Sequence, residues 1–258
     1  MMKKSICLIL ALLLILCTAA FAEKEEATAE QTPAPAPTVE AETIPEPTPE
    51  PLRLTGIKIG IDPGHQGRGN SEKEAIAPGS SEMKAKVSSG TEGVRTHVAE
   101  HVVNLQIGLM LRDALEALGA EVYMTRESAD VDISNQERAI MMNELGVDAV
   151  LRLHCDGAEG SKTNGIGLYI RATGEKAAEC EQLAKALMPA MLAATGAREF
   201  GTFKFDTYTG LNWSTVPCVM VEMGFMSNPD EDVRLNDPAY QAKLVEGMVN
   251  GICAYVGR

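Results

Sequence analysis

The feature that most constrains this fold is the alternation of short, largely apolar segments with segments of helical character. Strand-like runs occupy residues 54–62, 120–126, 147–154, 165–171 and 216–224. Helices are predicted over 99–118, 135–145, 174–195 and 238–255. Apolar strands separated by helices belong in a parallel or mixed sheet that is covered on both faces. We therefore expect one α/β domain over residues 54–258, with a central, mostly parallel sheet flanked by helices on both faces.

The first 53 residues have a different composition. Lys3 and Lys4 precede an apolar run, and Ala20 to Ala22 form an A-x-A site, which together are the pattern of a secretory signal peptide. The apolar run is shorter than the roughly 20 residues that span a bilayer. Residues 23–53 are rich in Pro, Glu and Thr and cannot bury enough apolar area to fold. We expect a signal peptide at 1–22, a disordered linker at 23–53, and a secreted protein without a transmembrane span.

The net charge limits the possible partners, and the cysteine spacing bears on metal and disulfide sites. The chain has 36 acidic and 23 basic side chains and a net charge of -13. Such a surface repels phosphate, so we expect no nucleic-acid partner. Four cysteines follow the signal segment: Cys155, Cys180, Cys218 and Cys253. Their spacing matches no metal motif, four cysteines allow three pairings, and buried free thiols explain them at least as well as disulfides.

Titratable side chains stand at the ends of three predicted strands. His65 follows the run ending at Asp62-Pro63-Gly64, His154 ends the run at 147–154, and Glu222 lies near the end of the run at 216–224. In open α/β sheets, ligands bind beyond the carboxyl ends of the strands. Imidazole nitrogen and carboxylate oxygen are ligands for zinc, so a divalent metal site is one interpretation of this pattern.

A zinc hydrolase generally uses three protein ligands and leaves one position for water. Three residues near the start of the predicted helix at 99–118 compete for the third position: His97, Glu100 and His101. Adjacent helical residues point about 100° apart, so at most one of Glu100 and His101 faces a given metal. Spacing alone leaves the choice open.

Four segments resemble, in order and spacing, the signature segments of zinc-dependent N-acetylmuramoyl-L-alanine amidases. They are IGIDPGHQG, AEHVVNL, LRLHCDGA and VEMGFMSNPDED. The resemblance extends over nearly everything from Ile57 to Tyr255 and implies an enzyme that hydrolyses peptidoglycan. The implied bond joins the lactyl group of N-acetylmuramic acid to the L-alanine of the stem peptide. The resemblance also implies a cell-wall location, and we expect a monomer.

The resemblance implies a role for each candidate residue. His65, Glu100 and His154 match the zinc ligands, and Glu222 matches the catalytic glutamate. Two positions depart from the family pattern, because Gln66 replaces a frequent glycine and Cys155-Asp156 replaces the usual Ala-Asn. Successive strand residues point to opposite faces, so we interpret Cys155 as a spectator rather than a ligand.

Other residues receive plainer interpretations. We expect Arg126 and Arg138 to fix loops through ion pairs or carbonyl contacts, and Trp213 to pack in the core or at its rim. The Gly/Ser-rich segment 67–96 is long for a structureless connection, so we expect it to be partly ordered or functional. It borders His65 and Glu100 in sequence, and Ser88 to Thr91 would suit contacts with the substrate.

Two other functions use the same features. A zinc peptidase acting on the stem peptide would need the same metal chemistry, although the four ordered segments argue against it. A non-catalytic wall-binding or regulatory module on the same fold would predict a lost ligand, and His65, Glu100, His154 and Glu222 are all present.

Overall fold

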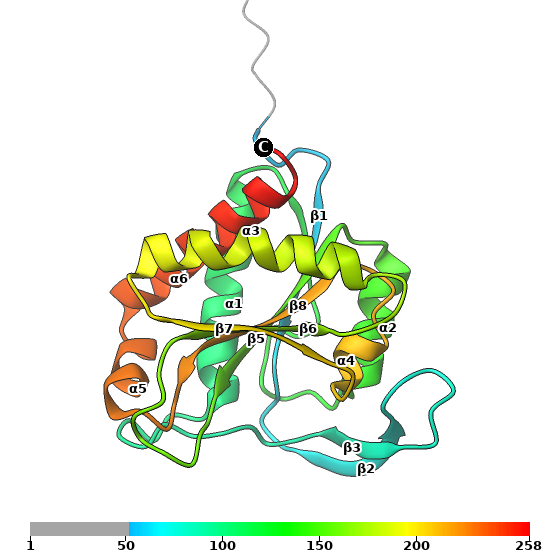
Figure 1. Cartoon of the computed structure of the whole chain (residues 1–258), viewed down its shortest axis with the longest axis horizontal. Helices are drawn as coiled ribbons and strands as arrows, with labels where there is room; N and C mark the ends of the chain where they lie inside the picture. Colours follow the sequence, from blue (N-terminus) through cyan, green and yellow to red (C-terminus); the bar gives the residue numbers. More distant parts are fainter. Residues whose placement is uncertain (1–51) are drawn as a thin grey trace, which may run out of the picture. The chain divides into compact units, whose positions relative to one another are not determined.

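The computed structural model describes residues 52–258, which form a six-stranded sheet with helices on both faces (Figure 1). The strands of this sheet are β1 (Lys58–Pro63), β4 (Glu121–Met124), β5 (Ala149–Asp156), β6 (Ile166–Arg171), β7 (Glu199–Phe205) and β8 (Cys218–Phe225). The helices are α1 (Glu100–Ala117), α2 (Asn135–Leu145), α3 (Ala177–Thr195), α4 (Thr209–Asn212), α5 (Pro229–Leu235) and α6 (Pro238–Tyr255).

The strand order is β4-β1-β5-β8-β6-β7. Strands β4, β1, β5 and β8 are parallel, whereas β6 pairs antiparallel with β8 and parallel with β7. The predicted α/β class with a mostly parallel sheet is confirmed. The carboxyl ends of β1, β5 and β8 adjoin, with Pro63 paired to Leu153 and His154 paired to Glu222.

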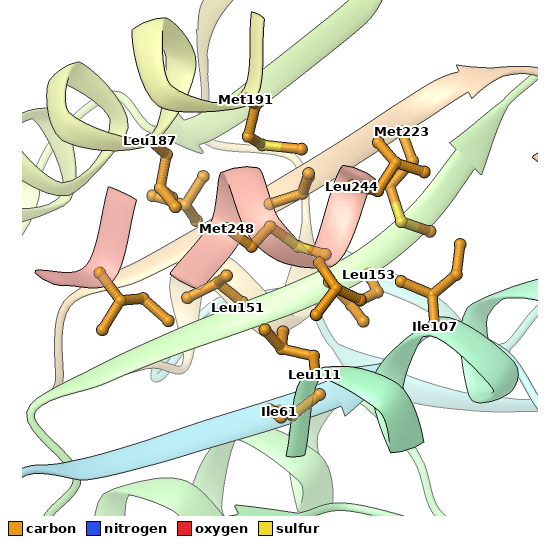
Figure 2. Close-up of a cluster of buried hydrophobic side chains, with 14 of the residues drawn as sticks. Ile61, Ile107, Leu111, Leu151, Leu153, Leu187, Met191, Met223, Leu244 and Met248 are labelled. Carbon is orange, nitrogen blue, oxygen red and sulfur yellow. The ribbon is translucent and has the colours of Figure 1, made fainter. Parts of the chain in front are cut away.

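The main core lies between the sheet and the layer formed by α1, α3 and α6. Figure 2 shows Ile61, Leu151 and Leu153 of the strands in one cluster with side chains from these three helices. The helical members labelled there are Ile107, Leu111, Leu187, Met191, Leu244 and Met248. A second cluster covers the other face, where Met142 of α2 and Leu211 of α4 pack with Val150 and Met220.

Two glycines let α6 lie close against α3. A Cβ added at Gly247 would lie 2.6 Å from the Cα of Met191, and one at Gly251 would lie 2.8 Å from the Cα of Leu187. Real Cβ atoms do not approach backbone this closely, so both positions require glycine despite its low helix propensity.

The segment 67–96 is more ordered than its composition indicated. It contains a two-stranded hairpin of β2 (Asn70–Ala75) and β3 (Met83–Val87), separate from the main sheet. Apolar and polar residues alternate over the five residues of β3 (MKAKV), but β2 (NSEKEA) is almost entirely polar, so the strand pattern in this segment is weak. Trp213 ties the hairpin to the body, because its indole Nε1 donates to the Ala75 carbonyl at 2.8 Å.

Besides β2 and β3, three further elements had no counterpart in the sequence prediction: α4, α5 and the edge strand β7. Helix α5 carries a recognisable start signal, since Asn228 caps its first turn and Pro229 occupies the first helical position. Cys155, Cys180, Cys218 and Cys253 are all buried and free. The interpretation of these residues as buried thiols is confirmed.

The expected signal peptide at 1–22 and nearly all of the expected linker at 23–53 lie outside the described residues. Within residues 52–258, no helix combines the length and the apolar character needed to cross a membrane.

A buried charge network lies beneath the carboxyl end of β1. The Asp62 carboxylate accepts a hydrogen bond from Arg138 at 2.8 Å and lies 2.9 Å from a guanidinium nitrogen of Arg152. Thr125 donates a further hydrogen bond to Asp62 at 2.6 Å. Burial opposes ionisation of Asp62, but the two guanidinium groups outweigh it and hold the pKa of the carboxyl far below its ordinary value.

Replacing Gly251 with Ala should destabilise the protein by about 1–2 kcal/mol. The new methyl group overpacks the α3–α6 contact, and this cost exceeds the roughly 1 kcal/mol that alanine gains in helix propensity. Urea unfolding measures the change. Asn250→Ala, at an exposed position of the same helix, is the control and should be neutral or slightly stabilising. A stabilised Gly251→Ala variant would contradict the close packing.

Asp62 should contribute to stability at neutral pH and lose that contribution in acid. Its folded pKa is depressed, so the stabilisation is complete above the unfolded value of about 4 and disappears as the pH falls toward the folded value. Asp62→Asn should cost about 3–5 kcal/mol at pH 7, because it leaves two buried guanidinium groups without an acid. The same variant should show a shallower loss of stability between pH 5 and pH 3, measured by urea unfolding.

The control for Asp62→Asn is Asp113→Asn. Asp113 pairs with Arg112 at the surface, where ion pairs contribute about 0–1 kcal/mol. Equal stability of wild type and Asp62→Asn at pH 7 would rule out the proposed role of the network.

Candidate metal centre

His65 stands in a tight turn directly after β1. Its backbone has φ of 61°, which is uncommon for a residue other than glycine. The preceding residue, Gly64, has to be a glycine, because a Cβ at that position would overlap the His154 ring. The turn thus brings the His65 side chain against His154, and the two ring centroids are 4.8 Å apart.

Two buried arginines hold this turn in place. Arg126 donates to the Pro63 carbonyl at 2.8 Å and to the Gly64 carbonyl at 3.0 Å. Arg138 donates to the His65 carbonyl at 3.0 Å while also bonding Asp62. The interpretation of both arginines as residues that fix loops through ion pairs or carbonyl contacts is confirmed, since both bond carbonyls and Arg138 also pairs with Asp62.

Glu100 is the first residue of α1 and is only 3% exposed. Its Oε1 atom lies 3.1 Å from Nε2 of His65 and 3.1 Å from Nδ1 of His154. Its Oε2 atom accepts a hydrogen bond from the Thr91 amide at 2.9 Å. Asn104, one helical turn later, donates to Glu100 at 3.2 Å.

His154 and Glu222 lie side by side on β5 and β8, in register with each other. Both side chains are buried. The Nε2 atom of His154 and the Oε2 atom of Glu222 have no hydrogen-bond partner. A buried polar atom without a partner costs about 1–3 kcal/mol, so a site that keeps two of them is built to receive a ligand.

The hydrogen bonding of His65 indicates what this ligand is. Its Nδ1 lies 2.9 Å from the Ser88 carbonyl, an acceptor to which it donates. In the neutral imidazole, Nε2 then carries a lone pair that faces the Glu100 carboxylate oxygen. Two acceptors 3.1 Å apart repel each other unless a proton or a cation lies between them. The arrangement is that of a cation site.

The donor set fits a divalent metal. Among residues 52–258, His65, Glu100 and His154 are the one group whose ligand atoms converge in this way, all within 4.8 Å of one another. Tetrahedral zinc bonds of about 2.1 Å place neighbouring ligand atoms about 3.4 Å apart, close to the observed spacing. Ser88 orients His65, and Asn104 orients Glu100, which is the supporting layer that metal sites require.

The shifted pKa values of Glu100 and Glu222 reflect the close packing of charged groups at this site. Burial opposes the charged form of Glu100, but hydrogen bonds from His154 and His65 outweigh it and lower its pKa. Burial, followed by repulsion from Glu100 and Asp156, raises the pKa of Glu222 well above its ordinary value. A cation bound at the three ligands would offset the repulsion between the two glutamates.

The other candidate ligands are not part of the converging group. His97 is exposed, and its ring lies beside Glu92. His101 follows Glu100 in α1 but is not part of the converging group. Cys155 is buried in the core with its thiol toward Asn104, and burial raises the pKa of that thiol well above its ordinary value. The structure agrees with the interpretation of Cys155 as a spectator.

The three converging residues and Glu222 line one cavity of about 680 Å³. Ser88, Gly90 and Thr91 of the segment 67–96 form part of its wall, as expected from their place in the sequence. Trp213 does not line this cavity. The roles of Ser88 and Asn104 were not predicted, although Asn104 stands four residues after Glu100 and therefore on the same helical face.

Comparison with known proteins finds similarity to N-acetylmuramoyl-L-alanine amidases. The family model described as N-acetylmuramoyl-L-alanine amidase matches residues 59–254. The amidase Rv3717 of Mycobacterium tuberculosis is 28% identical over 79% of this chain and 88% of that protein. LytC of Bacillus subtilis, also named as such an amidase, is 28% identical over 78% of this chain but only 36% of its own length.

Solved structures agree in fold. The amidase Ami1 of Mycobacterium smegmatis has a TM-score of 0.73 and 26% identity, covering 79% of this chain and 98% of that one. An amidase of Clostridium difficile 630 has a TM-score of 0.66 and 25% identity, covering 78% of this chain and 97% of that one. Because the family model spans most of the described residues, the chain belongs to the N-acetylmuramoyl-L-alanine amidase family.

Proposed function

We propose that this chain is a zinc-dependent hydrolase of peptidoglycan. It cleaves the amide bond between the lactyl group of N-acetylmuramic acid and the L-alanine of the stem peptide. The observation that carries this proposal is the convergence of His65, Glu100 and His154 beside Glu222 in one open cavity. The names of the similar amidases support the choice of substrate.

His65, Glu100 and His154 would hold the zinc ion. When bound, zinc lowers the pKa of water toward 7 and polarises the scissile carbonyl. The protein supplies the remaining groups. Ser88 keeps His65 in the tautomer whose Nε2 is free to bind, and Asn104 and Thr91 keep the Glu100 carboxylate aimed at the two rings.

Glu222 would act as the general base and then as the general acid. Its carboxylate is buried, lines the cavity and keeps an oxygen without a partner. It takes the proton of the attacking water and returns it to the amine nitrogen, because an amide nitrogen must be protonated to leave. Its raised pKa suits a group that must both accept and give up a proton.

The site of cleavage distinguishes this function from two alternatives. A zinc peptidase would cleave within the stem peptide, and a wall-binding module would cleave nothing.

We also propose that the protein acts outside the cell at the wall, in line with the signal-like pattern at 1–22 and the cell-wall substrate. The monomeric state stays a prediction.

Incubation of purified peptidoglycan with the zinc-loaded protein should release free L-alanine amino termini and leave the lactyl-glycan intact. Mass spectrometry of the new ends measures this directly. Cleavage inside the peptide would instead support the peptidase, and the absence of any cleavage would support the binding module.

Substitution of the site residues should separate metal binding from turnover. Glu222→Gln should retain one zinc per chain and lose at least about 10²-fold in turnover, since it removes the proton carrier. His154→Ala should lose the metal itself. Zinc content by atomic emission and turnover of peptidoglycan are measured side by side.

The matched controls are Glu116→Gln, which changes an exposed acid of α1, and His101→Ala, which removes the histidine next to Glu100. Both should retain zinc and activity. Full zinc content in His154→Ala, or wild-type turnover in Glu222→Gln, would contradict the assigned roles.

A further inference from the structure

The cavity that holds the candidate metal centre is lined by both acidic and basic side chains. Glu100, Asp156 and Glu222 lie among its acidic lining residues, whereas Lys73, Lys84 and Arg152 are its basic ones. The chain as a whole carries a net charge of -13. Three cations lining one cavity of so acidic a protein therefore call for a specific explanation.

Arg152 contributes a fixed positive charge to the cavity wall. It is 3% exposed. Arg138 and Arg152 share the single carboxylate of Asp62, and within residues 52–258 neither has another acid at ion-pair distance. The pair therefore keeps one uncompensated positive charge. In addition, Nε of Arg152 is buried without a hydrogen-bond partner. Such a charge is costly unless an anion lies nearby.

Lys84 of β3 is held at the same cavity. Its ammonium donates to the Thr207 carbonyl at 2.7 Å, which connects the hairpin to the loop before α4. An ammonium group has three N–H donors, so two remain for a ligand. Because Thr207 also lines the cavity, this bond places the charge at the wall.

Lys73 of β2 is the third cation. In the described part of the chain it forms no ion pair and no side-chain hydrogen bond, although it lines the cavity. Lys86, on the same hairpin, behaves differently. Its ammonium pairs with Glu72 at 2.8 Å, and it does not line the cavity. The hairpin therefore presents unneutralised cations to the cavity and a neutralised one elsewhere.

We propose that Lys73, Lys84 and Arg152 form a subsite that binds a free carboxylate of the stem peptide while the scissile amide lies at the His65, Glu100 and His154 cluster. This inference rests on the proposed function and names the group that the enzyme recognises. The cavity volume of about 680 Å³ is within the range of pockets that hold drug-sized ligands. Ammonium and guanidinium donors form charge-assisted hydrogen bonds with carboxylates.

The test compares two synthetic muramoyl peptides that differ in one group. One has a free α-carboxylate on the second residue of the peptide, and the other has the corresponding amide. The wild-type enzyme should show a kcat/KM about tenfold higher for the carboxylate, mainly through KM, because the contact is made equally in the ground and transition states. The preference should shrink as salt concentration rises.

Lys73→Met and Lys84→Met should each reduce kcat/KM for the carboxylate substrate about threefold to tenfold and leave the amide substrate within twofold. Lys84→Arg should retain most of the preference. Lys86→Met is the matched control, since it removes one positive charge from the same hairpin at a position outside the cavity, and it should leave both substrates unchanged. Arg152 is not substituted, because its loss would disturb the buried Asp62 network.

Three results would overturn the subsite. Equal kcat/KM of the wild type for both substrates would leave the proposed function standing and remove the subsite. A proportional loss on both substrates in Lys73→Met and Lys84→Met would make the lysines structural. If the wild type cleaves neither substrate and also leaves peptidoglycan intact, the proposed function fails and the subsite falls with it.

Discussion

The buried carboxylate of Glu100 is the interaction on which the site depends. A charged group removed from water needs compensation, and here two imidazole nitrogens lie 3.1 Å from one of its oxygens. Neutral imidazoles compensate that charge poorly, so the cluster is complete only with a cation or protons among the three groups. This requirement makes the position a candidate metal centre.

The rest of the scaffold serves to bring this carboxylate and the two rings together. Parallel β1, β5 and β8 end side by side, which delivers His65, His154 and Glu222 to one edge of the sheet. Helix α1 then brings Glu100 in from outside the sheet. Buried arginines fix the carbonyls of the His65 turn, so the unusual backbone of His65 is held by several independent hydrogen bonds.

The same arginine network has a second consequence. It places more buried positive charge near β1 and β5 than Asp62 neutralises, and part of this charge reaches the cavity wall through Arg152. The hairpin adds two lysines at that cavity. A substrate that is both an amide and a carboxylate would complement the two kinds of charge. Arg152 thus belongs both to the buried Asp62 network and to the proposed subsite.

The sequence by itself determined the class of fold, most of the strands and helices, and the residues that stand at the strand ends. These features are local, because strands covered on both faces are continuous apolar runs and amphipathic helices repeat about every 3.6 residues. The resemblance to the amidase family implied Glu100 rather than His101 as a ligand. Only the tertiary structure shows that the Glu100 carboxylate faces both imidazoles, that β6 and β7 run against the other strands, and that Arg152 shares Asp62 with Arg138. Each of these depends on strand order, on the rotation of a helix or on contacts between residues far apart in the chain, and local periodicity carries no information about them.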